Sequence, residues 1–242
     1  MPDALRLERE RAFHDARFDG ALSRAAQDAY YVAVEHGRDA YEARLSALAQ
    51  DADALEVGCG TGGQAAGLLG MAASVGGIDI SPVAVAAAQA RGVKAVAGDA
   101  EATGLPTESV DLLFGAGIVH HLDTHRFAEE AARLLRPGGA ALFWEPLGHN
   151  LAVNAYRRAT PSARTADEHP LRRGDLRALQ DAIGPMRLRF FGLATLPGLV
   201  LPEGAARRAG LAAGRMIDTG LLRVPGLRYQ AWYVLAEFTR RG

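Results

Sequence analysis

Residues 55–63 read Leu-Glu-Val-Gly-Cys-Gly-Thr-Gly-Gly, a short apolar run followed by four glycines in six positions. The apolar run predicts a strand, and the residues after the glycines predict the start of a helix. Glycines between a strand and a helix allow a tight turn and let a ligand lie on the backbone, where a side chain would collide. Gly58, Gly60 and Gly63 fit the pattern G-x-G-x-x-G, which by itself also fits a dinucleotide-binding dehydrogenase. The loop therefore predicts a ligand site and leaves the ligand open.

Around this loop, short apolar runs alternate with helical patterns. Pro82 suits the first turn of one of these helices and Ser81 suits its N-cap. Strands and helices that alternate in this way predict an α/β fold whose parallel sheet is covered on both faces. The predicted strands are residues 54–57, 74–80, 93–97, 110–114 and 140–144, and the predicted helices are residues 62–70, 82–91 and 124–135.

The flanking segments follow a different pattern. Residues 1–50 predict an N-terminal helical cap, because apolar positions recur at helical spacing from residue 4 onward. Residues 51–242 are expected to form one domain, with helical insertions around residues 147–183 and 203–220. Within that second part we predict helices over 151–159, 175–183 and 205–219, and strands over 186–193 and 228–238.

Composition narrows the class of protein. Of 242 residues, 49% are hydrophobic and 23% are charged, which is typical of a soluble globular chain, and no apolar run is long enough for a membrane helix. Cys59 is the one cysteine, so no internal disulfide can form, and we expect it to be a buried packing residue. Residues 1–10 lack the apolar core of a signal peptide. We therefore expect a cytoplasmic protein with no membrane partner.

Charge is unevenly distributed along the chain. The whole chain carries -1, whereas residues 157–242 contain 15 Arg, no Lys and 7 Asp and Glu, a formal charge of +8. A positive field of this kind could attract an anionic acceptor, although a solvated arginine-rich surface is the simpler interpretation. The near-neutral total and the 7% aromatic content give nucleic-acid binding little support.

Carboxylates at three successive strand ends distinguish between the possible cofactors. Glu56 ends the first strand, Asp79 ends the second, and Asp99 follows the third in a Gly-Asp-Ala sequence. Ligands in open α/β sheets bind at the carboxyl ends of the strands, so the three side chains are expected to meet there. They suit an ammonium group, ribose hydroxyls and an adenine amino group, and they suit a pyrophosphate poorly because like charges repel. S-adenosylmethionine has all three groups and no phosphate.

Five motifs in order resemble those of the class I (Rossmann-like) S-adenosylmethionine-dependent methyltransferase family, of the small-molecule type. The resemblance implies a seven-stranded, mostly parallel sheet whose last strand is antiparallel, with residues 186–193 and 228–238 as the final pair. It also implies S-adenosylmethionine as cofactor and S-adenosylhomocysteine as product. The motifs are residues 54–63, 78–81, 98–106, 109–122 and 135–139.

The resemblance also assigns cofactor contacts by position. It implies that Glu56 holds the methionine ammonium group, that Asp79 holds the ribose hydroxyls and that Asp99 accepts from the adenine amino group. In related enzymes an N-terminal helix often supplies an aromatic residue over the cofactor, so Tyr30 and Tyr31 are candidates. The expected cofactor-binding residues are Glu56, Gly58, Gly60, Asp79, Ile80, Asp99, Ala100, Gly115, Ala116 and Tyr31.

Candidates for acid–base chemistry follow the fourth and fifth strands. Only histidine has an ordinary pKa close to neutrality, so a histidine is the natural base where an acceptor must lose a proton. Ordinary packing or solvation is an alternative role for each. The candidates are His120, His121, Glu145 and His149.

Two further residues are candidates for substrate contact. Arg164 could pair with a carboxylate or phosphate, and His169 precedes a proline that favours an extended conformation. An arginine–acid network that ties the loop to the domain is an equally good interpretation. No acid pattern marks a catechol-type metal site, so we expect no metal.

The leading hypothesis is methyl transfer to an O or N atom, with C also possible, of a small molecule, including one from secondary metabolism. The residues after the fourth strand lack the Asn/Asp-Pro-Pro-aromatic string of DNA amino-methyltransferases and the paired glutamates of protein arginine methyltransferases. An NAD-binding oxidoreductase and a non-catalytic S-adenosylmethionine-binding protein remain as alternatives. We expect a monomer or a homodimer.

Overall fold

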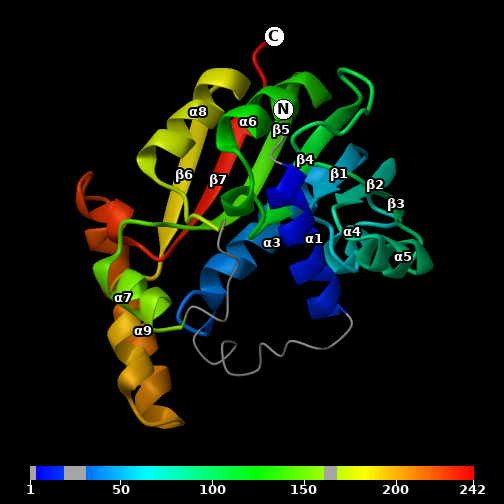
Figure 1. The fold of residues 1–242 in the computed structure, drawn as a ribbon. Helices are drawn as coiled ribbons and strands as arrows, with labels where there is room; N and C mark the ends of the chain where they lie inside the picture. Colours follow the sequence, from blue (N-terminus) through cyan, green and yellow to red (C-terminus); the bar gives the residue numbers. More distant parts are fainter. Residues whose placement is uncertain (1–3, 19–30, 161–167) are drawn as a thin grey trace.

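The computed structural model describes residues 4–18, 31–160 and 168–242 (Figure 1). Its centre is a seven-stranded sheet with the order β3-β2-β1-β4-β5-β7-β6. The strands are β1 (Asp53–Val57), β2 (Ser74–Asp79), β3 (Lys94–Ala97), β4 (Val110–Ala116), β5 (Leu135–Pro146), β6 (Met186–Phe191) and β7 (Tyr233–Thr239).

The pairing within the sheet matches the predicted Rossmann-like fold. Strand β1 pairs in parallel with β2 and β4, and β5 continues the parallel part beside β4. Strand β7 lies antiparallel between β5 and β6. The order places β1 and β4 side by side at the centre, where the direction of the crossovers reverses. Ligands of doubly wound sheets bind at such a point.

Helices cover both faces of the sheet. Strand residues alternate between the two sides, so Leu112 and Phe114 join the core under α3, α4 and α5, while Leu113 faces the core under α6 and α8 (Figure 1). Helix α9 and the 3-10 turn η3 pack together beside the β6–β7 hairpin. The helices are α1 (Ala4–Phe18), α3 (Glu35–Ala49), α4 (Gly63–Gly67), α5 (Pro82–Ala90), α6 (Thr124–Leu134), α7 (Leu151–Ala159), α8 (Arg173–Ile183) and α9 (Ala205–Leu221), with 3-10 turns η1 (Val119–His121), η3 (Leu196–Val200) and η4 (Leu227–Gln230).

The largest differences from the predicted strand boundaries are at the starts of β7 and β5. The strand predicted over residues 228–238 begins only at Tyr233, because residues 227–230 form η4. The N–H of Trp232 donates to the carbonyls of Phe191 and Gly192, which ends the hairpin ladder there. Strand β5 starts directly after α6, earlier than predicted, because Leu135 already pairs with Val110 before the register shift in β4.

Helix α1 lies across the carboxyl ends of the strands. The Arg6 guanidinium pairs with Glu101 in the loop after β3 and donates to the carbonyl of His121 in η1. Near the other end of the helix, Asp15 accepts from the Ser81 hydroxyl, directly after β2. Part of the predicted helical cap, residues 19–30, lies outside the described residues. No helix in the described ranges has the length and apolar character needed to cross a membrane.

Candidate active site

A cavity of about 730 Å³ lies at the carboxyl ends of the central strands. Residues that follow β1, β2, β3 and β4 line it, together with residues of α1, residues between 31 and 38, and residues from 144 onward. Such a volume lies within the usual range for small-molecule and cofactor pockets, about 300–1,000 Å³. The fold therefore presents one large concave site at the point where the sheet reverses direction.

The glycine loop forms the floor of this cavity. Gly58 and Gly60 both have positive φ angles, +64° and +51°, which residues other than glycine rarely adopt. A Cβ atom on Gly58 would also lie only 2.6 Å from the side chain of Ile118. The N–H of Cys59 donates to the carbonyl of Ile78 at 3.1 Å, which ties the loop to β2. Both glycines therefore bring bare backbone to the cavity wall.

Glu56 is a buried carboxyl group that lines the cavity. Its Oε2 atom accepts from the N–H of Ala65 in the first turn of α4, at 2.9 Å. Burial raises the pKa of Glu56 to about 8, and the Ala65 hydrogen bond acts in the opposite direction. A buried carboxyl group on a cavity wall favours a cationic ligand group, because the cation restores the ionised form.

Asp79 and Asp99 line the same cavity as Glu56. The Oδ2 atom of Asp79 accepts from the N–H of Gly60 at 2.8 Å, and its Oδ1 atom accepts from the N–H of Ser81 at 2.9 Å. Asp99 accepts from the N–H of Glu101 at 2.8 Å. Both carboxylates are therefore held by backbone N–H groups of the loops that follow the strands. The structure brings together the three carboxylates at successive strand ends.

Most of the other expected cofactor contacts also lie on the cavity wall. Ile80, Ala100, Ala116 and Tyr31 line it, but Gly115 is not among its lining residues. A Cβ atom at Gly115 would lie 2.9 Å from the carbonyl oxygen of Val57, so this glycine allows β1 and β4 to approach each other closely.

Sequence analysis missed several lining residues. Gly117 and Ile118 line the cavity just after β4, and Gly117 has a positive φ of +67°. A glycine directly after a strand in a ligand-binding fold was a signal that could have identified this turn. Trp232 also lines the cavity, and Tyr31 stacks on it with ring centroids 5.6 Å apart. No local pattern connects these two rings.

Comparisons with known proteins agree with this geometry. Residues 55–143 match the family model described as "Methyltransferase domain". A probable S-adenosylmethionine-dependent methyltransferase from Mycolicibacterium smegmatis is 36% identical over 106 residues, which cover 43% of this chain and 41% of that protein. The chain thus matches less than half of the length of that relative.

Solved structures with similar folds include two methyltransferases. The first, from Thermotoga maritima, is described as S-adenosylmethionine-dependent and as a possible histamine N-methyltransferase. It is 16% identical, with 89% of this chain and 95% of that chain covered and a TM-score of 0.61. The second is the geranyl diphosphate C-methyltransferase from Streptomyces coelicolor, in complex with Mg²⁺, geranyl diphosphate and S-adenosylhomocysteine. It is 18% identical, with 84% of this chain and 79% of that chain covered and a TM-score of 0.59.

Residues 55–143 of this chain thus resemble a methyltransferase domain, and the relative it matches is described as a probable S-adenosylmethionine-dependent methyltransferase. For the roles proposed below, we refer to the part of the cavity lined by Glu56, Asp79 and Asp99 as the cofactor wall, and to the part lined by His120, His121, Tyr156 and Arg157 as the acceptor wall.

On that wall, His120 is held by a buried glutamate. The Nδ1 atom of His120 lies 2.7 Å from Glu145 Oε2, and Glu145 Oε1 accepts from the N–H groups of Ile118 and Val119 at 2.9 Å each. Glu145 has no exposed surface and does not line the cavity, whereas His120 does. Burial lowers the pKa of His120. Glu145 therefore orients the imidazole and does not itself face a ligand.

The neighbouring His121 also lines the cavity, but it has a different partner. Its Nδ1 atom lies 3.2 Å from Oε2 of Glu10 on α1. Sequence analysis did not identify Glu10, because it lies 111 positions from His121 and belongs to no recognised motif. The two adjacent histidines thus connect to different parts of the chain.

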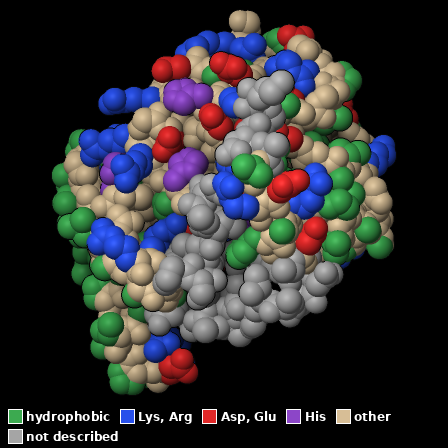
Figure 2. Space-filling view, viewed as in Figure 1, with side chains coloured by type: hydrophobic (Ala, Val, Ile, Leu, Met, Phe, Trp, Pro, Cys, Tyr) green, Lys and Arg blue, Asp and Glu red, His purple; other side chains and the backbone are tan. Residues whose placement is uncertain are grey.

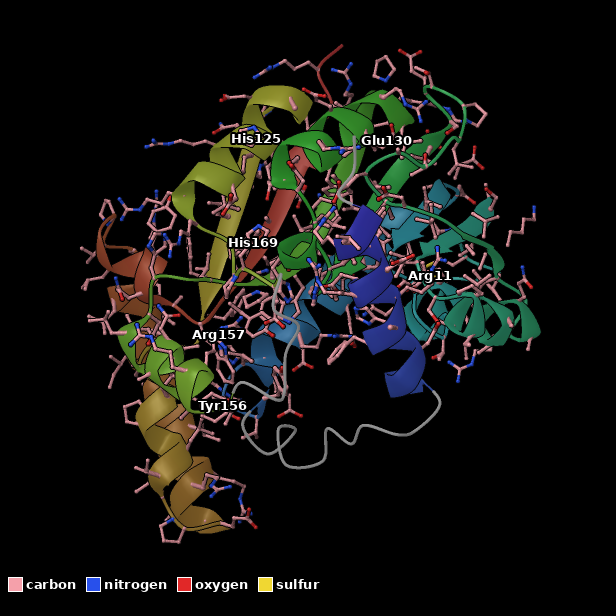
Figure 3. All side chains as sticks on the ribbon, in the orientation of Figure 1. Arg11, His125, Glu130, Tyr156, Arg157 and His169 are labelled. Carbon is pink, nitrogen blue, oxygen red and sulfur yellow. The ribbon has the colours of Figure 1, made fainter. Side chains whose placement is uncertain are left out.

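Arg157 and Tyr156 of α7 complete the acceptor side (Figure 3). The Nη2 atom of Arg157 lies 2.6 Å from Glu168 Oε1, and this same oxygen lies 3.8 Å from His120 Nε2. Figure 2 shows basic side chains gathered beside histidines on the left of the viewed face, where Figure 1 places α7 and α8. The arginine–acid network that was one interpretation of this segment is present as the Arg157–Glu168 pair.

Two further predicted residues are not brought to the cavity. His149 is not among its lining residues; its Nε2 atom accepts from the N–H of Arg173 at 3.3 Å. The side chain of His169 is exposed and lines a separate shallow pocket, while its N–H donates to the carbonyl of His120 at 2.8 Å. Arg164 lies outside the described residues.

Proposed function

We propose that this protein transfers the methyl group of S-adenosylmethionine to an O or N atom, or to a C atom, of a small anionic acceptor. The observation that carries the proposal is the composition of the cavity of about 730 Å³. Glu56, Asp79 and Asp99 line its cofactor wall, and His120 and Arg157 line its acceptor wall. One wall suits an adenosyl amino acid, and the other offers a basic nitrogen and a guanidinium group.

The cofactor would be held by the groups that the loops have already fixed. Glu56 would pair with the methionine ammonium group, and the free lone pairs of Asp79 would accept from the ribose hydroxyls. Asp99 would accept from the adenine amino group. Because Asp79 and Asp99 are positioned by backbone N–H groups, little ordering remains for them on binding.

The reaction needs alignment more than covalent help. The acceptor atom would attack the methyl carbon in line with the breaking carbon–sulfur bond, and the bonding pair would stay on sulfur to give S-adenosylhomocysteine. Holding the two reactants in line can supply up to about 7–11 kcal/mol of the barrier. The shape of the cavity is therefore the first catalytic contribution of the protein.

His120 is the residue best placed to take a proton from the acceptor. With Nδ1–H donating to Glu145, the tautomer leaves Nε2 as the acceptor, and the ring lines the cavity. Glu145 would then stabilise the imidazolium ion that forms. A base of this kind contributes about 10²–10⁴-fold where the acceptor must lose a proton.

Arg157 supports the anionic character of the acceptor. Its guanidinium group already pairs with Glu168, so an acceptor carboxylate or phosphate would add to that pair or compete with it. The Streptomyces coelicolor structure holds an anionic small molecule, geranyl diphosphate. A cytoplasmic location, a role in secondary metabolism and a monomeric or homodimeric state belong to this proposal as well.

Ligand-induced stabilisation tests the cofactor assignment. We expect S-adenosylhomocysteine to raise the melting temperature and NAD to leave it unchanged, and we expect Asp79→Asn to remove most of the shift. Asp39→Asn, an exposed change on α3, is the matched control. Stabilisation by NAD alone would refute the proposal.

Turnover is then measured as release of S-adenosylhomocysteine over a panel of phenols, amines and carboxylic acids. Methylation of an anionic member of the panel supports the acceptor class. Tight cofactor binding without turnover on any member would instead indicate a non-catalytic binding protein.

A further inference from the structure

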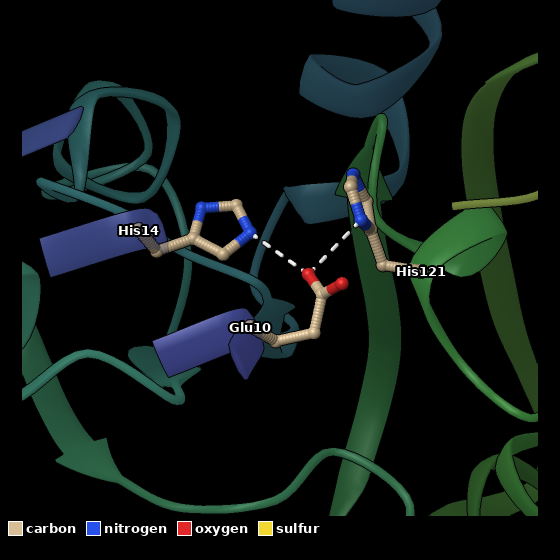
Figure 4. Close-up of side chains that lie close together, drawn as sticks. All are labelled: Glu10, His14 and His121. Carbon is tan, nitrogen blue, oxygen red and sulfur yellow. Dashed lines mark ion pairs between the residues drawn. The ribbon is translucent and has the colours of Figure 1, made fainter. Parts of the chain in front are cut away.

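Three nitrogen and oxygen donors meet where α1 crosses η1. Glu10 and His14 come from α1 and His121 comes from η1, and Figure 4 shows the Glu10 carboxylate between the two imidazole rings. Glu10 Oε2 lies 3.5 Å from His14 Nε2 and 3.2 Å from His121 Nδ1. Glu10 is 5% exposed and His121 is 8% exposed, so water screens the cluster weakly. All three residues line the large cavity.

The spacing fits a bound ion better than direct hydrogen bonds. Charge-assisted hydrogen bonds are about 2.7–2.9 Å long, and both contacts to Glu10 Oε2 are longer than this. In addition, the buried Nδ1 atom of His121 has no hydrogen-bond partner among the described residues. A tetrahedral ion with bonds of about 2.0–2.2 Å holds its donors about 3.3–3.6 Å apart. The measured separations lie close to that range.

The backbone also prepares the donors for a shared ligand. Glu10 and His14 are four residues apart on α1, so their side chains project from one face of the helix. Metal-binding helices commonly use this spacing. Arg6, one turn earlier, donates to the carbonyl of His121 at 3.0 Å and holds the helix against η1. The third donor is therefore fixed relative to the first two.

A neighbouring set of donors is less suitable. His120, His121 and Glu168 also lie close enough together to share an ion. However, His120 Nδ1 lies 2.7 Å from Glu145, and Glu168 pairs with Arg157 at 2.6 Å. Both separations are too short for an ion between the two groups, whereas the separations from Glu10 Oε2 to His14 and His121 are close to those around a tetrahedral ion, so the Glu10 set is the better candidate.

We propose that Glu10, His14 and His121 bind one divalent transition-metal ion of the zinc type. Two imidazole nitrogens and one carboxylate oxygen form the donor set of many zinc sites that keep one position open. Here the open position would face the cavity, where a water molecule or an oxygen or nitrogen atom of the acceptor can occupy it. The inference differs from the expectation of a metal-free protein, and it does not depend on the proposed methyl transfer.

Direct titration with Zn²⁺ and Co²⁺ tests this site. Tag-free full-length protein is treated with a chelator, freed of it, and titrated by calorimetry, and Co²⁺ is also followed by visible absorption. We expect one ion per chain and the intense absorption of four-coordinate Co²⁺. Glu10→Gln and His121→Gln should each weaken binding by more than about tenfold, since losing even a group that only supports a ligand often has that effect.

Matched variants separate the site from incidental binding. Glu8→Gln changes an exposed glutamate on the same helix, and His125→Gln changes an exposed histidine on α6 (Figure 3). Both should bind Co²⁺ as the unchanged protein does. A cooperative thermal unfolding transition and a far-ultraviolet circular dichroism spectrum like those of the unchanged protein show that each variant is folded. Absence of binding in the unchanged protein, or equal binding by Glu10→Gln and Glu8→Gln, overturns the proposal and leaves a carboxylate that bridges two imidazoles without metal.

Discussion

The two walls of the cavity are held in different ways. On the cofactor side, carboxylates accept from backbone N–H groups of nearby residues: Asp79 from Gly60 and Ser81, and Asp99 from Glu101. On the acceptor side, side chains pair with other side chains, and some partners are far apart in the chain. His120 pairs with Glu145, and His121 lies against Glu10.

This difference has consequences for substitution. A backbone donor cannot be removed by changing its side chain, so the cofactor side should respond mainly to changes in the carboxylates themselves. A side-chain pair can be broken from either member. We therefore expect changes on the acceptor side to alter turnover while leaving cofactor binding nearly unchanged.

The largest expected effect follows from His120→Gln. Glutamine can still donate to Glu145, but it provides no base, so kcat should fall about 10²–10⁴-fold for an acceptor that must lose a proton. The dissociation constant of S-adenosylhomocysteine should change less than about threefold, because that ligand is expected to contact the carboxylates of the cofactor wall and not His120. Steady-state kinetics and calorimetry measure the two quantities.

His125→Gln is the control for that experiment. His125 is exposed on α6 and is not among the residues that line the cavity. A kcat for His120→Gln within tenfold of the value for His125→Gln would show that His120 is not the base.

The next effect is on the cofactor wall. Asp79→Asn removes the charge while nearly keeping the shape, so the carboxylate-to-hydroxyl hydrogen bonds weaken. Hydrogen bonds to charged groups contribute about 1.5–3 kcal/mol, which corresponds to a 10- to 150-fold weaker affinity for S-adenosylhomocysteine. Calorimetric titration measures it, with Asp39→Asn as the exposed control. Unchanged affinity would mean that the ribose binds elsewhere.

The same contrast explains what the sequence could predict. The cofactor residues lie in short motifs, and their partners are two to nineteen positions away, so the pattern around Glu56, Asp79 and Asp99 predicted one shared groove. The parallel part of the sheet was predictable because alternating strands and helices leave few topologies, whereas the seven strands and the antiparallel last strand were implied by the family resemblance.

The acceptor wall was not predictable in the same way. The approach of Glu10 to His121 depends on how α1 docks, and no local pattern encodes it. His149 was predicted from its position after β5, and His169 from the segment that also contains Arg164, yet neither side chain lines the cavity. The position of a residue after a strand therefore did not predict whether its side chain lines the cavity, because this depends on pairing between side chains that are far apart in the sequence.

A smaller effect concerns pH. Burial raises the pKa of Glu56 to about 8, so near pH 7 this carboxyl group is mostly protonated, and pairing with an ammonium group requires the ionised form. Binding of S-adenosylhomocysteine should therefore release a proton below pH 8, and affinity should rise with pH by up to tenfold per unit before levelling off near pH 8. Calorimetry in two buffers of different ionisation enthalpy measures the release. Glu56→Gln should abolish the slope, and a slope that persists would assign the proton to another group.

The smallest effect tests how the acceptor wall is supported. Asn150 caps α7 by accepting from the N–H of Val153 at 3.0 Å, and it also donates to the carbonyl of Gln230 at 2.6 Å. Losing a cap costs about 0.5–2 kcal/mol, and each kcal/mol lowers the melting temperature of a chain of this size by about 2–4 °C. Asn150→Ala should therefore melt a few degrees lower and raise KM for the acceptor, because α7 carries Arg157. Asp123→Ala removes the corresponding cap of α6 and leaves α7 intact, so its KM for the acceptor should stay unchanged. An equal rise in KM in both variants would show that α7 does not shape the acceptor wall.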